Sequence, residues 1–359
     1  MRVVVGLSGG VDSAVAALML KRAGHDVIGV FMKNWEEKDE NGVCTAEKDS
    51  ADAQAVCDVL DIPFYTVNFA RDYWDRVFSE FLAEYRRGRT PNPDVLCNRE
   101  IKFNVFLDYA LKLGADKLAT GHFAGVDCVN GEYRLLRSAD ENKDQTYFLY
   151  MLNQRALSKA MFPVGGLTKP EIRRIARENG LPVSEKKDST GVCFIGERNF
   201  RKFLSTYLPA QPGDMVTPEG RVVGRHIGLM YYTLGQRRGL GIGGGGNGQR
   251  WFVIEKDLQN NRLVVQQGGD DPRLYTLSAL GEQPTWLSEH PPAPDGVPVP
   301  CQVRLRHRQP LQGCALTLRG DTVEMTFEAP QRAVTPGQSA VFYQGPVCLG
   351  GCIVSAAHA

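Results

Sequence analysis

The chain has 359 residues, too many for one ordinary domain, so two or three domains are expected. Its net charge of +1 does not indicate a nucleic-acid partner, so any RNA-binding site must be formed by local clusters of basic residues. No apolar run reaches the roughly 20 residues that cross a bilayer. Met1 and one arginine precede core-strand sequence, so no signal or transit peptide is expected and the predicted location is cytoplasmic.

The first 208 residues alternate between two hydrophobic patterns. Short apolar runs predict strands, and apolar residues at helical spacing predict helices. The expected strands are 3–5, 27–32, 64–67 and 117–120, and the expected helices are 12–23, 51–60, 72–85 and 103–113. A later helix begins at Thr168 with a capping box to Glu171 and ends before Gly180. This alternation predicts a Rossmann-like parallel sheet with helices on both faces.

Beyond Leu208 the pattern becomes rich in short strands. A Pro- and Gly-containing linker at 209–213 leads into a small β-rich central domain, predicted over 209–272, with strand signals at 221–223, 251–254 and 263–265. A C-terminal β-barrel is predicted over 273–359. Its strand signals are 303–305, 316–318, 323–327, 340–343 and 348–354, and the proline-rich stretch 291–300 is predicted to be a surface loop.

The segment GLSGGVDS follows the first strand and opens the first helix. Backbone N–H groups of a glycine-rich turn and the positive end of a helix dipole favour a bound anion at such a place. The segment lacks the lysine of a Walker A motif, so it is a different phosphate loop. Asp12 either orients a nucleotide or its magnesium ion, or caps the helix. The predicted anion-binding residues, which the resemblance given below assigns to a nucleotide, are Gly6, Leu7, Ser8, Gly9, Gly10, Val11, Asp12 and Ser13.

A second glycine-rich stretch, 239–244, formally fits GxGxxG. Neither a strand before it nor a helix after it is expected, and further glycines follow. A flexible loop is therefore predicted there, and a dinucleotide site is excluded.

Nine cysteines without any CxxC pair argue against a disulfide framework and a cysteine-ligated metal, so no protein metal site is predicted. Two of them, Cys97 and Cys193, stand in polar, turn-forming sequence. Both are predicted to lie in loops near helix N-termini, where a thiol pKa is lowered. Taken singly, each also fits a buried structural cysteine. Cys348 and Cys352 fit small buried side chains on a C-terminal strand.

The phosphate loop resembles the SGGxDS signature of the PP-loop ATP pyrophosphatases. With the two cysteines, the chain resembles the tRNA 2-thiouridylase family of that superfamily over its whole length. Further segments carrying this resemblance are GVFMKNW at 29–35, TPNPD at 90–94, IKF at 101–103, TGH at 120–122, KDQ at 143–145, STGVC at 189–193 and YTLGQ at 232–236. His307 stands where an aromatic residue is common in the family, which puts only a local RNA contact in doubt.

The resemblance implies a reaction. ATP, with Mg²⁺, adenylates O2 of the wobble uridine of tRNA and releases pyrophosphate. Sulfur then passes to C2 from a Cys193 persulfide, charged by a cysteine desulfurase or a sulfur-relay protein. Cys97 resolves the intermediate as a Cys97–Cys193 disulfide, giving 2-thiouridine and AMP. Asp94 serves as a general acid or base, or else only forms an Asx turn. Met32 and Gly121 join the nucleotide contacts by the same analogy.

The resemblance also implies tRNA contacts in all three domains. Asn92, Pro93 and Asp94 would face a base flipped out of its stack. The remaining implied contacts are His122, Lys143, Asp144, Gln145, Arg306, His307 and Gln338. His122 alternatively fits a hydrogen-bonded core histidine. Basic residues cluster at 86–89, 186–187, 198–202, 237–238 and 304–308, and each cluster alone fits a solvated face as well as a phosphate contact.

Three rival functions stay open at this level. A PP-loop synthetase that amidates or ligates a small molecule would not need the two cysteines. An iron–sulfur thiolase would need cluster ligands, which the missing CxxC disfavours. A non-catalytic RNA-binding or ATP-sensing protein would bind nucleotide without releasing pyrophosphate.

Overall fold

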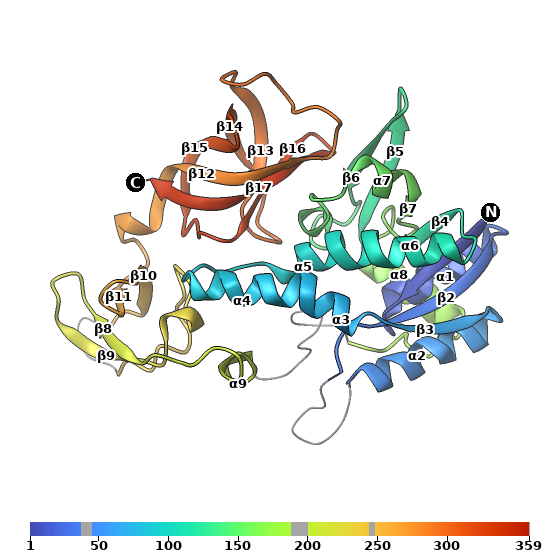
Figure 1. Cartoon of the computed structure of the whole chain (residues 1–359), viewed down its shortest axis with the longest axis horizontal. Helices are drawn as coiled ribbons and strands as arrows, with labels where there is room; N and C mark the ends of the chain where they lie inside the picture. The colour runs from blue at the N-terminus through green and yellow to red at the C-terminus, as the bar shows by residue number, and fades with distance from the viewer. Residues whose placement is uncertain (37–44, 188–199, 244–247, 359) are drawn as a thin grey trace.

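The computed structural model describes residues 1–36, 45–187, 200–243 and 248–358. Figure 1 shows a helix-covered parallel sheet, a small antiparallel-rich sheet and a barrel, in chain order. This is the predicted fold class. No helix in the described ranges is long and apolar enough to cross a membrane.

The N-terminal sheet has the strand order β3-β2-β1-β4-β7, and all of its pairings are parallel. Its strands are β1 (Arg2–Leu7), β2 (Asp26–Lys33), β3 (Phe64–Asn68), β4 (Lys117–Thr120) and β7 (Ala160–Met161). The first four confirm the expected strands. The two-residue β7 is too short to leave a hydrophobic pattern and was not predicted.

Helices cover both faces of this sheet because β1 is apolar on both sides. Val3, Val5 and Leu7 pack against α1 (Val11–Arg22), α2 (Thr45–Leu60) and α8 (Lys169–Glu178). Val4 points the other way, into a core built largely from the chain between 69 and 162. The alternation of side chains along a strand separates these two layers.

Helices α1 and α8 end at the predicted glycines, and α8 begins at the predicted capping box. Gly24 and Gly180 follow α1 and α8 with φ of 79° and 63°, a conformation that glycine adopts without a steric cost. At the start of α8 the Thr168 N–H donates to the Glu171 carboxylate over 2.7 Å, so the predicted capping box is confirmed.

Two helix predictions are wrong at their starts. The helix expected at 51–60 begins six residues earlier, at Thr45 of α2. The helix expected from residue 103 begins ten residues earlier and runs through α5 (Pro93–Leu96), the π-helical segment η2 (Cys97–Val105) and α6 (Phe106–Lys112). Asn92 caps it and Pro93 takes its first position, where a missing N–H costs nothing. The turn-forming residues before Cys97 are therefore helix-start signals. The expected helix at 72–85 forms as α3 (Ala70–Tyr73), π-helical η1 (Trp74–Phe78) and α4 (Ser79–Arg86).

The central sheet has the order β10-β11-β8-β9. Its strands are β8 (Gly213–Val216), β9 (Val222–His226), β10 (Trp251–Asp257) and β11 (Arg262–Gln267). Stretch 239–243 is a loop, as expected. The sheet is tied to its neighbours: the Lys256 ammonium donates to the Gly88 carbonyl over 3.2 Å, and the Arg332 guanidinium lies 5.1 Å from the Phe252 ring centroid.

The barrel is closed because β12 pairs with both β15 and β17. Its strands are β12 (Tyr275–Trp286), β13 (Val299–Arg304), β14 (Gln312–Arg319), β15 (Thr322–Arg332), β16 (Ser339–Gln344) and β17 (Val347–His358). Strand β12 was not predicted, since Gly281 and Pro284 interrupt its pattern. Cys348 and Cys352 are buried on β17, as expected.

A hairpin from the first 208 residues extends the barrel. Strands β5 (Ala124–Val129) and β6 (Glu132–Arg137) pair with each other, and Leu135 and Leu136 of β6 pair with Cys348 and Val347 of β17. Figure 1 shows this hairpin beside the barrel. The first 208 residues and the barrel therefore share one continuous sheet, which a division by sequence pattern cannot reveal. The domain boundaries at 208 and 272 stay predictions.

Candidate active site

The phosphate loop is a tight turn between β1 and α1. Gly9 has φ of 71°, and a Cβ there would lie 2.4 Å from the Asp49 carbonyl oxygen, so only glycine fits. The Ser13 hydroxyl accepts from the Ser8 N–H over 3.2 Å and donates to the Gly10 carbonyl over 3.1 Å. No side chain in the described ranges caps α1. Its first N–H groups are therefore suited to a polyphosphate.

Gly121 and Met32 both lie beside this loop. A Cβ at Gly121 would come within 2.5 Å of the Ser13 backbone nitrogen, so the turn after β4 packs directly on the start of α1. A Cβ at Gly6 would lie 3.8 Å from Met32 Cε and 3.0 Å from Phe106 Cε1. Gly121 and Met32, assigned to the nucleotide by resemblance, thus both lie next to the phosphate loop. Phe106 of α6, in the long helix that begins at Pro93, lies next to the loop as well.

Two lysines reach the loop from distant segments, and no sequence motif assigns either of them to it. Lys169, at the start of α8, places Nζ 2.6 Å from Asp12 Oδ1 with little exposure to solvent. Lys186 donates from Nζ to the Gly9 carbonyl over 2.9 Å and to Asp49 Oδ1 over 2.8 Å. The absence of a lysine within the loop is therefore offset by cations brought in by the fold.

The Lys169–Asp12 pair leads to a first prediction. We expect Lys169→Met to raise the KM for ATP about tenfold, because a buried charge-assisted bond beside the phosphates is lost and Asp12 is left without this cation. Initial pyrophosphate release at varied ATP measures this effect. Lys112→Met, on the exposed end of α6, removes the same charge elsewhere and serves as the control. An unchanged KM for ATP in the Lys169 variant would contradict the role.

Cys97 lies inside the long helix, in its second turn, and not in a loop as predicted. Its side chain is buried in the main core. The π-helical geometry of η2 begins at this residue, and such segments often occur at functional sites. In this conformation solvent does not reach the Cys97 sulfur, so any reaction there requires its surroundings to move.

The start of this helix is anchored to the barrel. Asn92 Oδ1 accepts from the Asp94 N–H over 3.2 Å, so Asn92 rather than Asp94 forms the Asx cap. Gln338 Nε2 donates to the Thr90 carbonyl over 2.6 Å, and the Thr90 N–H donates to the Pro336 carbonyl over 3.0 Å. The fold thus brings the Asn-Pro-Asp segment next to Gln338, from the loop before β16.

His122 is buried between the loop and the long helix. Its Nδ1 lies 2.7 Å from Thr120 Oγ1, and its Nε2 lies 3.5 Å from Lys102 Nζ. Burial, followed by the Lys102 charge, lowers the pKa of His122 well below its ordinary value, so the imidazole is neutral at pH 7. In this structure the side chain matches the core alternative, and a tRNA contact stays a prediction.

The turn after β4 therefore connects three parts of the site. Gly121 packs on the phosphate loop, and His122 faces the η2 segment that begins at Cys97. The Phe123 N–H donates to Gln145 Oε1 over 2.9 Å. Three consecutive residues, 121 to 123, thus hold the loop, the helix carrying Cys97 and the 143–145 segment together.

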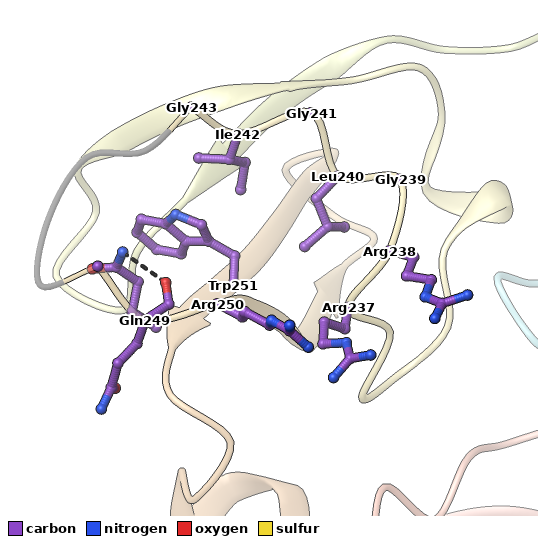
Figure 2. Close-up of a pocket in the computed structure, with 12 residues that line it drawn as sticks. Arg237, Arg238, Gly239, Leu240, Gly241, Ile242, Gly243, Gln249, Arg250 and Trp251 are labelled. Atoms are coloured by element: carbon purple, nitrogen blue, oxygen red, sulfur yellow. Dashed lines mark hydrogen bonds between the residues drawn. The ribbon is translucent and has the colours of Figure 1, made fainter.

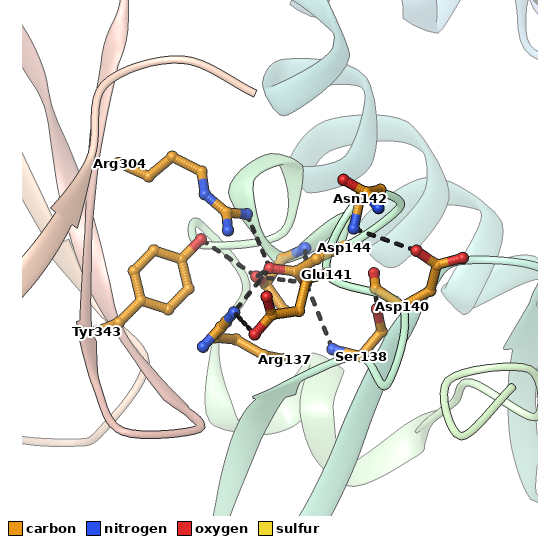
Figure 3. A network of polar contacts seen from close by, with 9 residues as sticks. Arg137, Ser138, Asp140, Glu141, Asn142, Asp144, Arg304 and Tyr343 are labelled. Carbon is orange, nitrogen blue, oxygen red and sulfur yellow. Dashed lines mark hydrogen bonds and ion pairs between the residues drawn. The ribbon is translucent and has the colours of Figure 1, made fainter. Parts of the chain in front are cut away.

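Asp144 is fully buried in a network between the first 208 residues and the barrel (Figure 3). Its carboxylate accepts from the Arg304 guanidinium over 2.8 Å and from the Thr146 hydroxyl over 2.9 Å. That hydroxyl lies 3.1 Å from the Tyr343 hydroxyl. The Asp144 carboxylate therefore links the first 208 residues to the barrel through Arg304. Arg304, predicted as part of a basic cluster, is likewise buried.

Arg306 and His307 follow Arg304 of this network in the chain. Arg306 is exposed and donates to the Ala333 carbonyl over 2.7 Å. The His307 ring centroid lies 4.6 Å from that of Phe148, whose carbonyl accepts from Asn98 Nδ2 over 3.0 Å. Burial, followed by the charges of Arg308 and Arg304, lowers the pKa of His307 to about 4. Uncharged at pH 7, His307 can offer a ring face to a base, but not a cation to a phosphate.

Comparison with known proteins decides the family. Models described as "tRNA methyl transferase HUP domain", "tRNA methyl transferase PRC-barrel domain" and "Aminomethyltransferase beta-barrel domain" match residues 1–197, 201–267 and 278–354. The tRNA-specific 2-thiouridylase MnmA of Alkaliphilus oremlandii is 58% identical over 98% of this chain and 96% of its own length. That of Streptococcus sanguinis is 56% identical over 100% and 96%. The chain belongs to the tRNA-specific 2-thiouridylase family.

A solved 4-thiouridine synthetase–RNA complex with bound ATP is 20% identical, with a TM-score of 0.34 over 52% of this chain and 42% of that one. This likeness is too low to support an inference.

Cys193 and its neighbours from 188 to 199 lie outside the residues that the structure describes. Lys143 is half-buried in the turn between Asp140 and Asp144. The assignments of site residues therefore stay predictions.

Proposed function

We propose that this chain is an ATP-dependent tRNA-uridine 2-sulfurtransferase acting on the wobble uridine. One observation carries the proposal: the turn at residues 120–123 contacts both the phosphate loop and the helix in which Cys97 lies. Thiolation requires the bound nucleotide, which activates the base, and the reacting sulfur atoms to lie at the same place. Family membership supplies the substrate class, and we place the reaction in the cytoplasm.

The phosphate loop fits a nucleotide, as its glycine conformation and the uncapped start of α1 indicate. Bound there with Mg²⁺, ATP supplies an adenylate leaving group at O2 of the base and releases pyrophosphate. Gly9 and Gly121 allow close backbone approach, Ser8 and Ser13 offer hydroxyl groups, and Lys169 compensates phosphate charge. Asp12, paired with Lys169, lies where it can orient a nucleotide-bound magnesium ion.

Sulfur arrives as a persulfide on Cys193, delivered by a desulfurase or a relay protein. Its terminal sulfur bonds to C2 as AMP leaves. The Cys97 thiolate then attacks Cys193 Sγ, which breaks the S–S bond, leaves sulfur on the base and forms a Cys97–Cys193 disulfide. An external thiol must reduce this disulfide before the next turnover. Asp94, two residues beyond the Asn92 cap, would exchange protons with the base.

The contacts to tRNA divide into direct and supporting groups. Gln338 donates to the Thr90 carbonyl, two residues before the Asn92 cap, so Asn92, Pro93 and Gln338 belong to the junction of helix and barrel, where we place the flipped base. By family resemblance we also assign Lys143, Arg306 and His307 to direct contacts with the tRNA. We assign His122, Asp144 and Gln145 the supporting part, because their side chains hold the elements together.

The test is mass analysis of nucleosides from wobble-uridine tRNA incubated with the protein, ATP, magnesium and a persulfide source. We expect 2-thiouridine and equimolar AMP from the unaltered chain and no thiolation by Cys193→Ser. Cys128→Ser, which alters an exposed cysteine on β5, should retain full activity. Thiolation that persists without Cys193 would refute the sulfur route, and pyrophosphate release without 2-thiouridine would refute the product.

A further inference from the structure

The central domain contains a basic hollow that the proposed reaction does not use. Its volume is about 420 Å³, within the size range of sites for small molecules. It lies between the loop at 237–243 and the first residues of β10 (Figure 2). No aspartate or glutamate is among its lining residues, which include Arg237, Arg238 and Arg250.

The three arginines carry charge that the described structure does not neutralise. Each side chain is exposed, and none forms an ion pair or a side-chain hydrogen bond with another residue of the ranges 1–36, 45–187, 200–243 and 248–358. Elsewhere in those ranges many arginines are paired, such as Arg87 with Glu84 and Arg273 with Asp271. Three unpaired guanidinium groups around one hollow favour a polyanionic ligand, because guanidinium binds phosphate in a bidentate manner.

The floor of the hollow suits a flat ring. Trp251 is half-buried, and Figure 2 shows its indole below Ile242, with Arg237 and Arg238 to one side. Its Nε1–H is shielded from solvent and has no acceptor in the described structure. Buried indole N–H groups are usually hydrogen-bonded, so an acceptor from a ligand would complete this one.

The loop above the ring leaves room for such a ligand. Gly241 has φ of 66°, and a Cβ at Gly241 or Gly243 would meet nothing within 4 Å. Ile242 between them lies close to β9, since its Cγ1 is 3.4 Å from the position of a Cβ on Gly224. The loop therefore presents backbone and one apolar side chain over the Trp251 ring without filling the space.

Phosphate-binding cations around an aromatic floor are the features by which proteins hold an unpaired nucleotide of RNA. We propose that this hollow binds a nucleotide of the tRNA, with its base on Trp251 and its phosphates on Arg237, Arg238 and Arg250. In Figure 1 the central sheet lies at the opposite end of the molecule from β1–β4, so the hollow is a second RNA site, remote from the phosphate loop. The inference rests on the proposed function for its ligand.

Three variants test it by filter binding of a full-length tRNA transcript. The triple change Arg237→Gln, Arg238→Gln and Arg250→Gln should weaken binding about tenfold or more and reduce the salt slope by about two to three. Trp251→Leu should weaken binding about tenfold, whereas Trp251→Phe, which keeps a stacking face, should restore most of the affinity. In thiolation assays the triple variant should raise the KM for tRNA and leave kcat within twofold.

The matched control removes three charges from the same domain outside the hollow: Arg221→Gln, Arg225→Gln and Arg262→Gln. Equal losses in the two triple variants would overturn the proposal, because only general electrostatic attraction would then be at work. Unchanged tRNA binding by the hollow variant, with loss of binding to an acidic protein partner instead, would also overturn it. Binding by the unaltered chain is measured without turnover, so failure to thiolate would count against the proposed function alone.

Discussion

Cys97→Ser is expected to lower the multiple-turnover rate of thiolation by roughly 100-fold or more, while pyrophosphate release in the first turnover persists. A serine hydroxyl cannot attack the S–S bond at neutral pH, so the product would stay attached to Cys193 through sulfur. Rapid-quench assays followed by nonreducing separation of protein and tRNA measure both parts. The expected species is an RNA–protein adduct that an added thiol releases.

The burial of Cys97 makes a matched control necessary. Cys57 is also fully buried, on α2 and away from the long helix, and Cys57→Ser should cost stability without trapping an adduct. If both variants slowed turnover equally and neither accumulated the adduct, the loss would come from packing. The resolving role of Cys97 would then be wrong.

Gly121→Ala is expected to reduce pyrophosphate release about 100-fold, because a misplacement of about 1 Å near reacting groups can have that effect. The added methyl group would lie 2.5 Å from the Ser13 nitrogen and 2.8 Å from Ser13 Cα, and both are parts of the main chain that cannot rotate away. The start of α1 must shift, and the phosphate loop shifts with it. ATP-dependent pyrophosphate release, measured with saturating tRNA, reports the change.

Gly166→Ala is the matched control, since a Cβ at that position meets nothing within 4 Å. It should leave both the activity and the melting temperature close to those of the unaltered chain. Gly121→Ala should retain a cooperative unfolding transition, because the close contact is local to the loop. Normal pyrophosphate release by the Gly121 variant would mean that the turn after β4 does not position the nucleotide.

Local sequence patterns were enough to predict the elements that neighbouring residues stabilise. The strands around the phosphate loop, the helix it opens and the capping box at Thr168 all follow from neighbouring residues. The same applies to most barrel strands, which alternate or run apolar over short distances. The early start of the long helix was missed although Asn92 and Pro93 signal it, because turn formers and helix caps are the same residue types.

What the sequence by itself determined is a phosphate loop opening a helix, a parallel sheet and a family carried by motifs. Only the tertiary structure decided which side chains meet. Lys169 reaches Asp12 from 157 positions away, and Arg304 reaches Asp144 from 160. It also decided that Cys97 and His122 are buried, and that a hairpin of the first domain joins the barrel. The physical reason is that motif and period report local backbone preference, whereas pairing and burial depend on packing between elements far apart in the chain.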